Sequence, residues 1–145
     1  MLFRSPTAKE LRNSFDTVTG GESLNNPSRM MRGTHGNIGV IPREIADRLR
    51  NRTFNNFNKF RNTFWQEVAN SSYANEFCQS NISRMQQGLA PKAVKEQHYG
   101  KISSYILHHI NPIHNGGGVY DIDNLVISTP LMHQSILDPN FHFNN

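Results

Sequence analysis

Three histidines and one asparagine in the last third of the chain have the residue types needed to hydrolyse a phosphodiester. His108 and His109 are adjacent, Asn124 follows them, and His133 comes last. Imidazole binds transition metals and moves protons near neutral pH. Cutting a phosphodiester needs a cation to stabilise charge and a base to activate water. We therefore expect a metal-assisted hydrolytic site here, with the Asn124 amide tying down a loop.

Two strands and a helix are expected to position these residues. Apolar and β-branched residues around them predict strands at 103–108 and 124–129, joined by a loop with a Gly-rich turn. A threonine that can cap a helix and a proline suited to the first helical position predict a helix over 130–137. Because neighbouring strand residues point to opposite faces, His108 and His109 can join one site only if the first strand ends or twists there.

The other histidines carry less weight, since a lone histidine is usually a surface residue or a core residue whose hydrogen bonds are satisfied. We give that interpretation to His35, His98 and His114. His142 follows a helix-stopping Pro139, and nothing in the sequence requires it to fold back toward the site.

The chain before the site is predicted to be irregular at first and then helical. Residues 1–37 are polar, basic and rich in Gly and Asn, with one short helix expected near 8–15. Apolar residues at three-to-four-residue spacing then predict three helices. The first begins at Pro42, the second runs from Asn56 to Val68, and the third runs from Tyr73 to about Gly88 with Cys78 buried. We divide the chain into a basic segment, 1–37, and a domain, 38–145.

The charge of the chain favours a polyanionic partner. Its 145 residues carry a formal net charge of +4, and the pI is about 9.5. No Lys or Arg follows Lys101, so contacts to phosphates would come from the Arg-rich first third of the chain, although a solvated helix face explains several of these arginines. They include Arg29, Arg32, Arg43, Arg48, Arg50 and Arg52. No single residue stands out as a nucleic-acid contact.

Cysteine usage and hydropathy exclude other classes. The single cysteine excludes a disulfide within the chain and a Cys-based zinc knuckle. No apolar run reaches membrane-spanning length, and the first residues do not form a signal peptide. We expect a cytosolic chain or a piece of something exported by other means.

The histidine motif and several earlier segments resemble the HNH DNase domains of colicins and S-type pyocins, with the pyocin branch the nearer. The resemblance covers roughly residues 38–136, whereas residues 1–37 share little with the family. A match over this many separate segments is specific. The matching segments include Ile-Pro-Arg-Glu-Ile-Ala-Asp-Arg-Leu-Arg at 41–50, Phe-Asn-Lys-Phe-Arg-Asn-Thr-Phe-Trp-Gln-Glu-Val at 57–68, Tyr-Ile-Leu-His-His at 105–109, Gly-Gly-Val-Tyr-Asp at 117–121, and Thr129-Pro130 with His133.

This resemblance implies an α+β fold in which a helical domain surrounds a ββα-metal (His-Asn-His) finger at the C-terminal end. It implies a metal-dependent, largely sequence-nonspecific DNA endonuclease, the toxin domain of a bacteriocin. Carried over to this chain, His108 and His133 are metal ligands, His109 is the general base, and Asn124 fixes the loop. The cofactor would be one divalent transition metal, either Zn²⁺, Ni²⁺ or Mn²⁺, with Mg²⁺ as a further candidate.

The resemblance also implies two partners. DNA would be the substrate, and a small acidic immunity protein would bind beside the active site at an exosite formed by Arg61, Met85 and Pro91. We expect a bacterial monomer, made in the cytoplasm, released as or within a toxin, and acting in the cytoplasm of the target cell. The sequence contains no receptor-binding or translocation region of the kind colicins use. The chain is therefore expected to be a module of a larger toxin, an orphan remnant, or an effector exported differently.

The chain departs from the family at functional positions. The third metal-binding histidine of the family lies four residues after the second, and Leu137 stands there. Asp138 is rotated roughly 140° from His133 on the helix and would point away. Further replacements are Ile106 for an acidic residue, Ile102 for an arginine, and Leu131-Met132 for a basic pair.

Two hypotheses remain open. In the first, the chain is an impaired nuclease in which His108 and His133 hold a labile metal completed by water, and His109 still acts as base. In the second, it is a decayed pseudonuclease that keeps DNA or immunity-protein binding without useful turnover. A purely structural helical domain would make the motif an accident, and we give it little weight.

Overall fold

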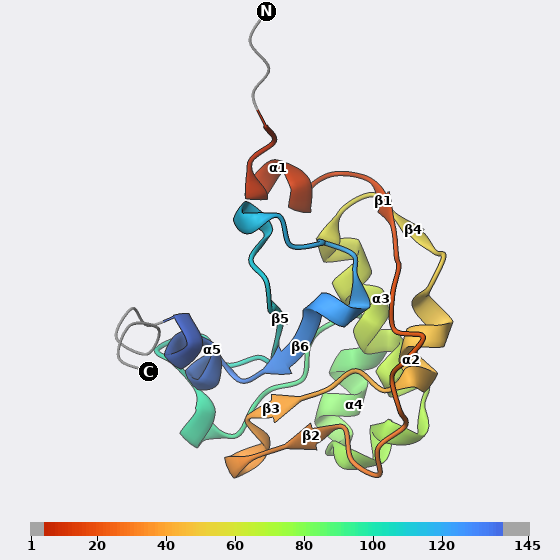
Figure 1. Cartoon of the computed structure of the whole chain (residues 1–145). Coiled ribbons are helices and arrows are strands. Elements are labelled where there is room, and N and C mark those ends of the chain that lie inside the picture. The colour runs from red at the N-terminus through yellow and green to blue at the C-terminus, as the bar shows by residue number, and fades with distance from the viewer. Residues whose placement is uncertain (1–4, 138–145) are drawn as a thin grey trace, which may run out of the picture.

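Helices surround a small antiparallel sheet, which is the α+β architecture predicted from the sequence (Figure 1). The computed structural model describes residues 5–137. Its α-helices are α1 (Ala8–Arg12), α2 (Arg43–Leu49), α3 (Phe57–Ala69), α4 (Gln79–Gln86) and α5 (Pro130–Leu137). Its strands are β1 (Asp16–Thr17), β2 (Met31–Arg32), β3 (Ile38–Gly39), β4 (Thr53–Phe54), β5 (Ile106–His109) and β6 (Leu125–Ser128). Single 3-10 turns include η2 (Ser72–Glu76), η3 (Lys95–Gln97), η4 (Ile113–Asn115) and η5 (Ile122–Asn124).

The sheet carries the predicted strand–loop–strand–helix unit at one edge. Its four strands lie in the order β2-β3-β6-β5, and each neighbouring pair is antiparallel. In the β5–β6 register, His108 lies opposite Val126 and His109 lies opposite Leu125. β1 and β4 form a separate antiparallel pair. Because β5 has a strand on one side only, its outer side is open to neighbouring elements.

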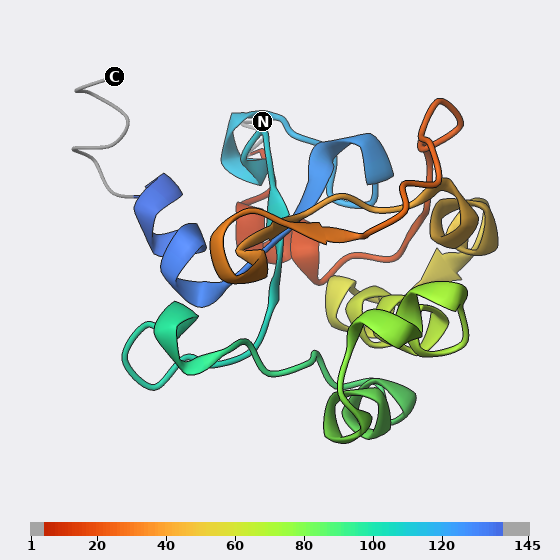
Figure 2. The same ribbon diagram turned by 90° about the horizontal axis from the view of Figure 1, so that it is seen from below.

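The aromatic stripe of α3 forms the centre of the core, as predicted. Its buried members are Phe57, Phe60, Phe64, Trp65 and Val68. The side chain of Asn56 caps the helix by accepting from the backbone N–H of Lys59 at 2.9 Å. Figures 1 and 2 show α3 and α4 on one side of the sheet. Burial of each of these side chains stabilises the fold by about 1.5–3 kcal/mol.

The predicted third helix is wrong as one continuous element. The chain forms the short turn η2, becomes extended at Phe77, and starts α4 only at Gln79. The Ser71 hydroxyl caps η2, and the Tyr73 hydroxyl donates to the Pro27 carbonyl at 2.6 Å, which ties this turn to an earlier segment. Cys78 is exposed at the N-cap of α4, not buried as expected, because the cap position lies outside the packed face.

The segment before residue 38 packs into the same core. Val18, Met30 and Met31 are buried within it. The Glu76 carboxylate accepts from the backbone N–H groups of Met30 and Met31 at 2.5 and 3.0 Å. The division at residue 37 stays a prediction, but β1 and β2 show that this segment contributes strands to both sheets.

The first or last residues of several elements also differ from the predicted ones. Pro42 is the N-cap residue of α2 rather than its first helical residue, and the strand carrying the histidine pair spans 106–109. The expected helix near 8–15 is present as α1. Within residues 5–137, no helix is long and apolar enough to cross a membrane.

Candidate active-site cleft

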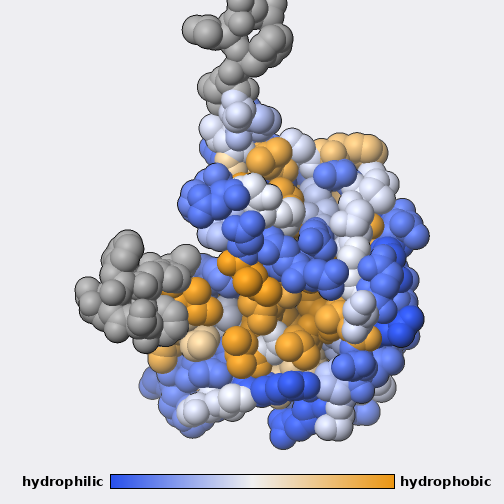
Figure 3. Space-filling view, viewed as in Figure 1, coloured by the Kyte–Doolittle hydropathy of each residue, from blue (hydrophilic) through white to orange (hydrophobic). Residues whose placement is uncertain are grey.

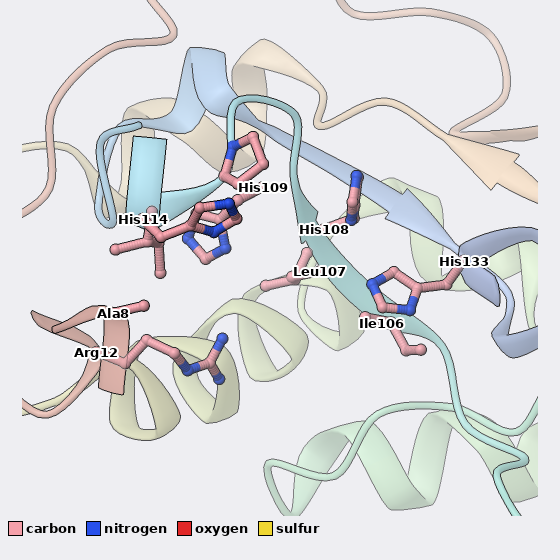
Figure 4. Close-up of a pocket in the computed structure, with 10 residues that line it drawn as sticks. Ala8, Arg12, Ile106, Leu107, His108, His109, His114 and His133 are labelled. Atoms are coloured by element: carbon pink, nitrogen blue, oxygen red, sulfur yellow. The ribbon is translucent and has the colours of Figure 1, made fainter. Parts of the chain in front are cut away.

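The histidines of the motif line one cleft of about 330 Å³ beside the edge strand β5. Its walls come from α1, β5, η4 and the first turn of α5. In Figure 3, the outline of the molecule is indented between the regions of α1 and α5. Figure 4 shows the polar side chains of the cleft: Arg12, His108, His109, His114 and His133.

His108 and His133 face each other across the cleft. Their ring centroids lie 4.9 Å apart with an interplanar angle of 77°. His108 is held by the β5–β6 register, and His133 lies in the first turns of α5, which begins at the predicted Pro130. Burial lowers the pKa of His133, so its imidazole is neutral near pH 7 and has a lone pair that a metal can use.

His109 lies on the opposite face of β5, against the core. Its side chain is 8% exposed, and its ring packs against Phe57 at a centroid distance of 4.9 Å. Nε2 lies 3.0 Å from the Val119 carbonyl oxygen, which can only accept, so Nε2 donates and Nδ1 keeps its lone pair. Burial lowers the pKa of His109, the bond to Val119 raises it, and the charge of Arg12 lowers it, with a net lowering.

Both faces of β5 contribute to one cleft because β5 is the edge strand. His108 and His109 point to opposite faces of the sheet, and a strand in the middle of the sheet would separate them. His108 and His109 both line the cleft, and β5 ends at His109 on the open edge of the sheet.

Asn124 clamps the loop that carries the acceptor for His109. Its Oδ1 accepts from the Asn111 N–H at 2.8 Å, and its Nδ2 donates to the carbonyls of Asn111 and Gly118 at 3.0 Å each. The loop is tight at Gly117, where a Cβ would lie 1.8 Å from the Asn111 carbonyl oxygen. Asn124 thereby fixes both ends of the loop, next to the Val119 carbonyl.

Arg12 is a cleft residue that the sequence did not single out. Its guanidinium lies over the Phe57 ring at 4.7 Å from the centroid, and α1 contacts η4. Burial and the charge of Arg61 lower the pKa of Arg12, with a smaller opposing effect from Tyr120. Arg12 is thus a half-buried positive charge on the wall of the cleft. No local pattern predicts this, because α1 reaches the cleft only through the tertiary fold.

His114 also lines the cleft, although it was expected to be an ordinary surface histidine. His114 is exposed on η4, so it is a surface histidine as expected and also part of the cleft wall. His98 fits its expected structural role, with Nε2 bonded to the Ala93 carbonyl oxygen at 2.8 Å. His35 is exposed on the turn between β2 and β3.

The arginines expected to hold phosphates lie mostly elsewhere. Several of them form ion pairs with acidic residues of α2, α3 and the preceding loop. These pairs are Arg43–Asp47, Arg48–Glu67, Arg50–Asp47, Arg50–Glu22 and Arg52–Glu67. Among the described residues that line the cleft, Arg12 is the one arginine.

The predicted exosite residues have different surroundings. Arg61 is half-buried, whereas Met85 and Pro91 are buried and offer little surface to a partner. The adjacent groove of about 300 Å³ is lined instead by Arg61 together with the exposed Leu89 and Ile102. An exosite at this place would therefore use these neighbours of Met85 and Pro91.

The position at which a third histidine ligand was expected lies at the end of the described chain. Leu137 is the last residue of α5, and Asp138, Pro139 and His142 lie outside the described residues. Within residues 5–137, no group of three or more His, Cys, Asp or Glu residues is placed to hold a metal ion. Ile106, where an acidic residue was expected from the resemblance, lines the cleft.

Comparison with known sequences gives a consistent set of relatives. A family described as "Colicin/Pyocin-S2, DNase domain" matches residues 16–138. Colicin-E8 of Escherichia coli is 46% identical over 97 residues, covering 66% of this chain and 47% of the colicin. Pyocin-S2 of Pseudomonas aeruginosa is 38% identical over 104 residues, covering 71% of this chain and 15% of the pyocin. The chain thus spans about half the length of colicin-E8 and less of pyocin-S2.

Two solved structures share the fold. The pyocin AP41 DNase–immunity complex aligns with a TM-score of 0.75 at 35% identity, covering 86% of this chain and 93% of that one. The mutant nuclease domain of pyocin S8 with its cognate immunity protein aligns with a TM-score of 0.74 at 34% identity, covering 84% and 98%.

Proposed function

This chain belongs to the colicin and pyocin DNase family, and on that premise we propose that it is a metal-dependent, largely sequence-nonspecific DNA endonuclease domain of a bacteriocin. The observation that carries the proposal is the pair of facing imidazoles, His108 and His133, with the buried His109 on the same cleft. Metal-binding and proton-accepting groups are thus within one small volume, as phosphodiester hydrolysis requires.

The facing pair fits a divalent transition metal. Two imidazole nitrogens suit Zn²⁺ or Ni²⁺, whereas Mn²⁺ and Mg²⁺ prefer oxygen ligands, which water would have to supply. When bound, the metal would supply Lewis-acid stabilisation of charge on the phosphate and the leaving oxygen. His108 and His133 would hold it, and water would complete a site that has leucine where the family has a third histidine.

His109 is the proposed base. A neutral imidazole with Nε2 donating to Val119 can take a proton only at Nδ1. Its lowered pKa keeps the ring unprotonated near pH 7, so it can accept a proton from an attacking water. Asn124 supports this role indirectly, because it fixes the loop that presents the Val119 carbonyl.

Arg12 is the proposed phosphate contact. It lies in the cleft with the histidines, and within residues 5–137 it forms none of the ion pairs described above. A half-buried guanidinium near another positive charge gains most from a bound anion. The DNA backbone would supply that anion.

A small acidic immunity protein is the proposed protein partner. The similar pyocin domains are seen in complexes with immunity proteins. The groove with Arg61, Leu89 and Ile102 combines a positive charge with exposed apolar side chains, which suits an acidic partner with an apolar anchor. Action in the cytoplasm of a target cell belongs to the same proposal.

A decayed pseudonuclease is the competing hypothesis, favoured by the apolar Ile106 and by Leu137 at two functional positions. Plasmid nicking by the purified chain with Mg²⁺, Mn²⁺, Ni²⁺ and Zn²⁺ in turn separates the two. We expect weak nicking with a transition metal that is lost in His109→Ala and kept in His98→Ala, a histidine outside the cleft. Retained DNA binding without cleavage by any metal would contradict the enzyme proposal.

A further inference from the structure

A buried pair of side chains connects the η3 turn to the start of the helix that carries His133. The Thr129 hydroxyl donates to Oε1 of Gln97 at 2.7 Å. Thr129 is 0% exposed and Gln97 is 6% exposed, so water does not compete for this bond. Figures 1 and 2 both place η3 beside the N-terminal turn of α5, and the two elements are in contact.

Gln97 sets the direction of the Thr129 hydroxyl. A hydroxyl has one proton to donate, and Gln97 takes it, so the oxygen lone pairs remain for the Met132 N–H at 3.3 Å. Thr129 is thereby held as the cap of α5. The backbone N–H of His133 donates to the Thr129 carbonyl at 2.8 Å, the first helical turn after that cap. The rotation of α5 about its axis, and with it the direction of the His133 ring, starts from Thr129.

Few of the described side chains of α5 are buried, although the helix also contacts β5. Pro130 is buried, but the described side chains that follow it are half-buried or exposed. Asn37 also holds this end: its carbonyl accepts from the Thr129 N–H at 3.1 Å, and its Nδ2 donates to the Met132 sulfur at 4.0 Å. This backbone bond fixes where the helix begins but does not set how the side chain of Thr129 points.

We propose that Gln97 is a positioning residue for His133, acting through the hydroxyl of Thr129. This inference rests on the proposed function insofar as His133 is taken to bind metal. Gln97 does not line the cleft and touches no reacting atom. Its contribution is to keep the His133 ring facing His108 at the 4.9 Å centroid distance.

The test uses the whole chain with Gln97→Leu, which removes the acceptor while filling the space. Val68→Ala, in the core of α3, is the control for lost stability alone. The first readout is the ¹⁵N and ¹H imidazole spectrum of the metal-free protein. We expect the His133 ring resonances and the contact between the His133 and His108 rings to change in Gln97→Leu and to stay unchanged in Val68→Ala.

Zinc affinity is the second readout, measured by competition with a chromogenic chelator. Gln97→Leu is expected to weaken Zn²⁺ binding about tenfold, because loss of a group that orients a metal ligand commonly lowers metal affinity by about this much. Thr129→Val should weaken Zn²⁺ binding to a similar extent, whereas Thr129→Ser keeps the hydroxyl and should keep most of the affinity. The double variant Gln97→Leu with Thr129→Val should bind Zn²⁺ little more weakly than either single variant.

Two outcomes would overturn the inference: unchanged His133 resonances in Gln97→Leu, or effects no larger than those of Val68→Ala. If the unsubstituted chain binds none of Zn²⁺, Ni²⁺ and Mn²⁺, the proposed function fails, and the metal-free spectra still decide the positioning role. If Gln97→Leu does not fold, the same spectra are compared for Thr129→Ser and Thr129→Val. Of these two variants, only Thr129→Ser keeps the hydroxyl that donates to Gln97.

Discussion

Nε2 of His109 donates to the carbonyl oxygen of Val119 at 3.0 Å, and this single bond decides which nitrogen of the ring can act as a base. The neutral ring then carries its proton on Nε2, and Nδ1 is the acceptor. Because the His109 ring is buried against Phe57, the cleft can keep this tautomer in one orientation.

The first prediction concerns pH. Burial lowers the folded-state pKa of His109, and that of His133, below the unfolded value. The unfolded chain therefore binds more protons, so the free energy of unfolding falls as pH drops through the ordinary histidine range and is fully regained above it. Urea denaturation from pH 5 to 8 should show this fall, and His109→Gln should flatten it. If the free energy of unfolding of His109→Gln fell with pH as steeply as that of the unsubstituted chain, the His109 ring would not be buried in its neutral form.

The loop clamp predicts a large cost for a small change. Asn124→Ala removes three hydrogen bonds and should lower the free energy of unfolding by about 3 kcal/mol, because the Asn111 and Gly118 groups lose their partner. The exposed Asn55→Ala should change it by less than about 0.5 kcal/mol. Equal denaturation midpoints for the two variants would show that the clamp does not stabilise the fold.

Arg12 should contribute to the salt dependence of DNA binding. Arg12→Ala is expected to weaken binding of a short duplex and to reduce the slope of log K against log salt by about 0.9, the value for one lost phosphate contact. Fluorescence anisotropy with a chelator present measures binding without cleavage. Arg48→Ala, whose guanidinium pairs with Glu67 at 3.6 Å, is the control and should keep the slope. If Arg12→Ala kept the slope of the unsubstituted chain, Arg12 would not contact a DNA phosphate.

A histidine at position 137, where a third ligand was expected, should strengthen the proposed metal site. Leu137→His adds an imidazole one helical turn after His133, and we expect Zn²⁺ affinity to rise about tenfold or more, with faster plasmid nicking. Ser135→His adds the same group two residues after His133, about 200° around the helix from it, and should not do so. If both variants behave alike, the position of Leu137 does not explain a weak metal site.

The sequence predicted what depends on local pattern. The stripe from Phe57 to Val68 and the α5 start at Pro130 were predicted because helical periodicity and capping are encoded within a few residues. The pairing of His108 and His133 as candidate metal ligands came instead from the resemblance to the family. The break at Phe77 was not predicted, because it depends on a contact between Tyr73 and the distant Pro27.

The composition of the cleft required the tertiary fold. That His108 and His109 share a site follows from β5 lying at the sheet edge, which is a property of strand order. Arg12 enters the cleft because α1 packs against η4, about a hundred residues later in the chain. The burial of Met85 and Pro91 likewise depends on how α4 packs on α3, which moved the proposed exosite toward Leu89 and Ile102.

A titration with Zn²⁺ that follows the histidine side chains tests the roles of His108, His109 and His133 most directly. In ¹⁵N imidazole spectra of the whole chain, we expect the His108 and His133 resonances to change together with one equivalent of metal. His109 should keep its Nε2-protonated form throughout. Metal-induced changes at His109 in place of His133, or no change at either His108 or His133, would contradict the assignment of ligands and base.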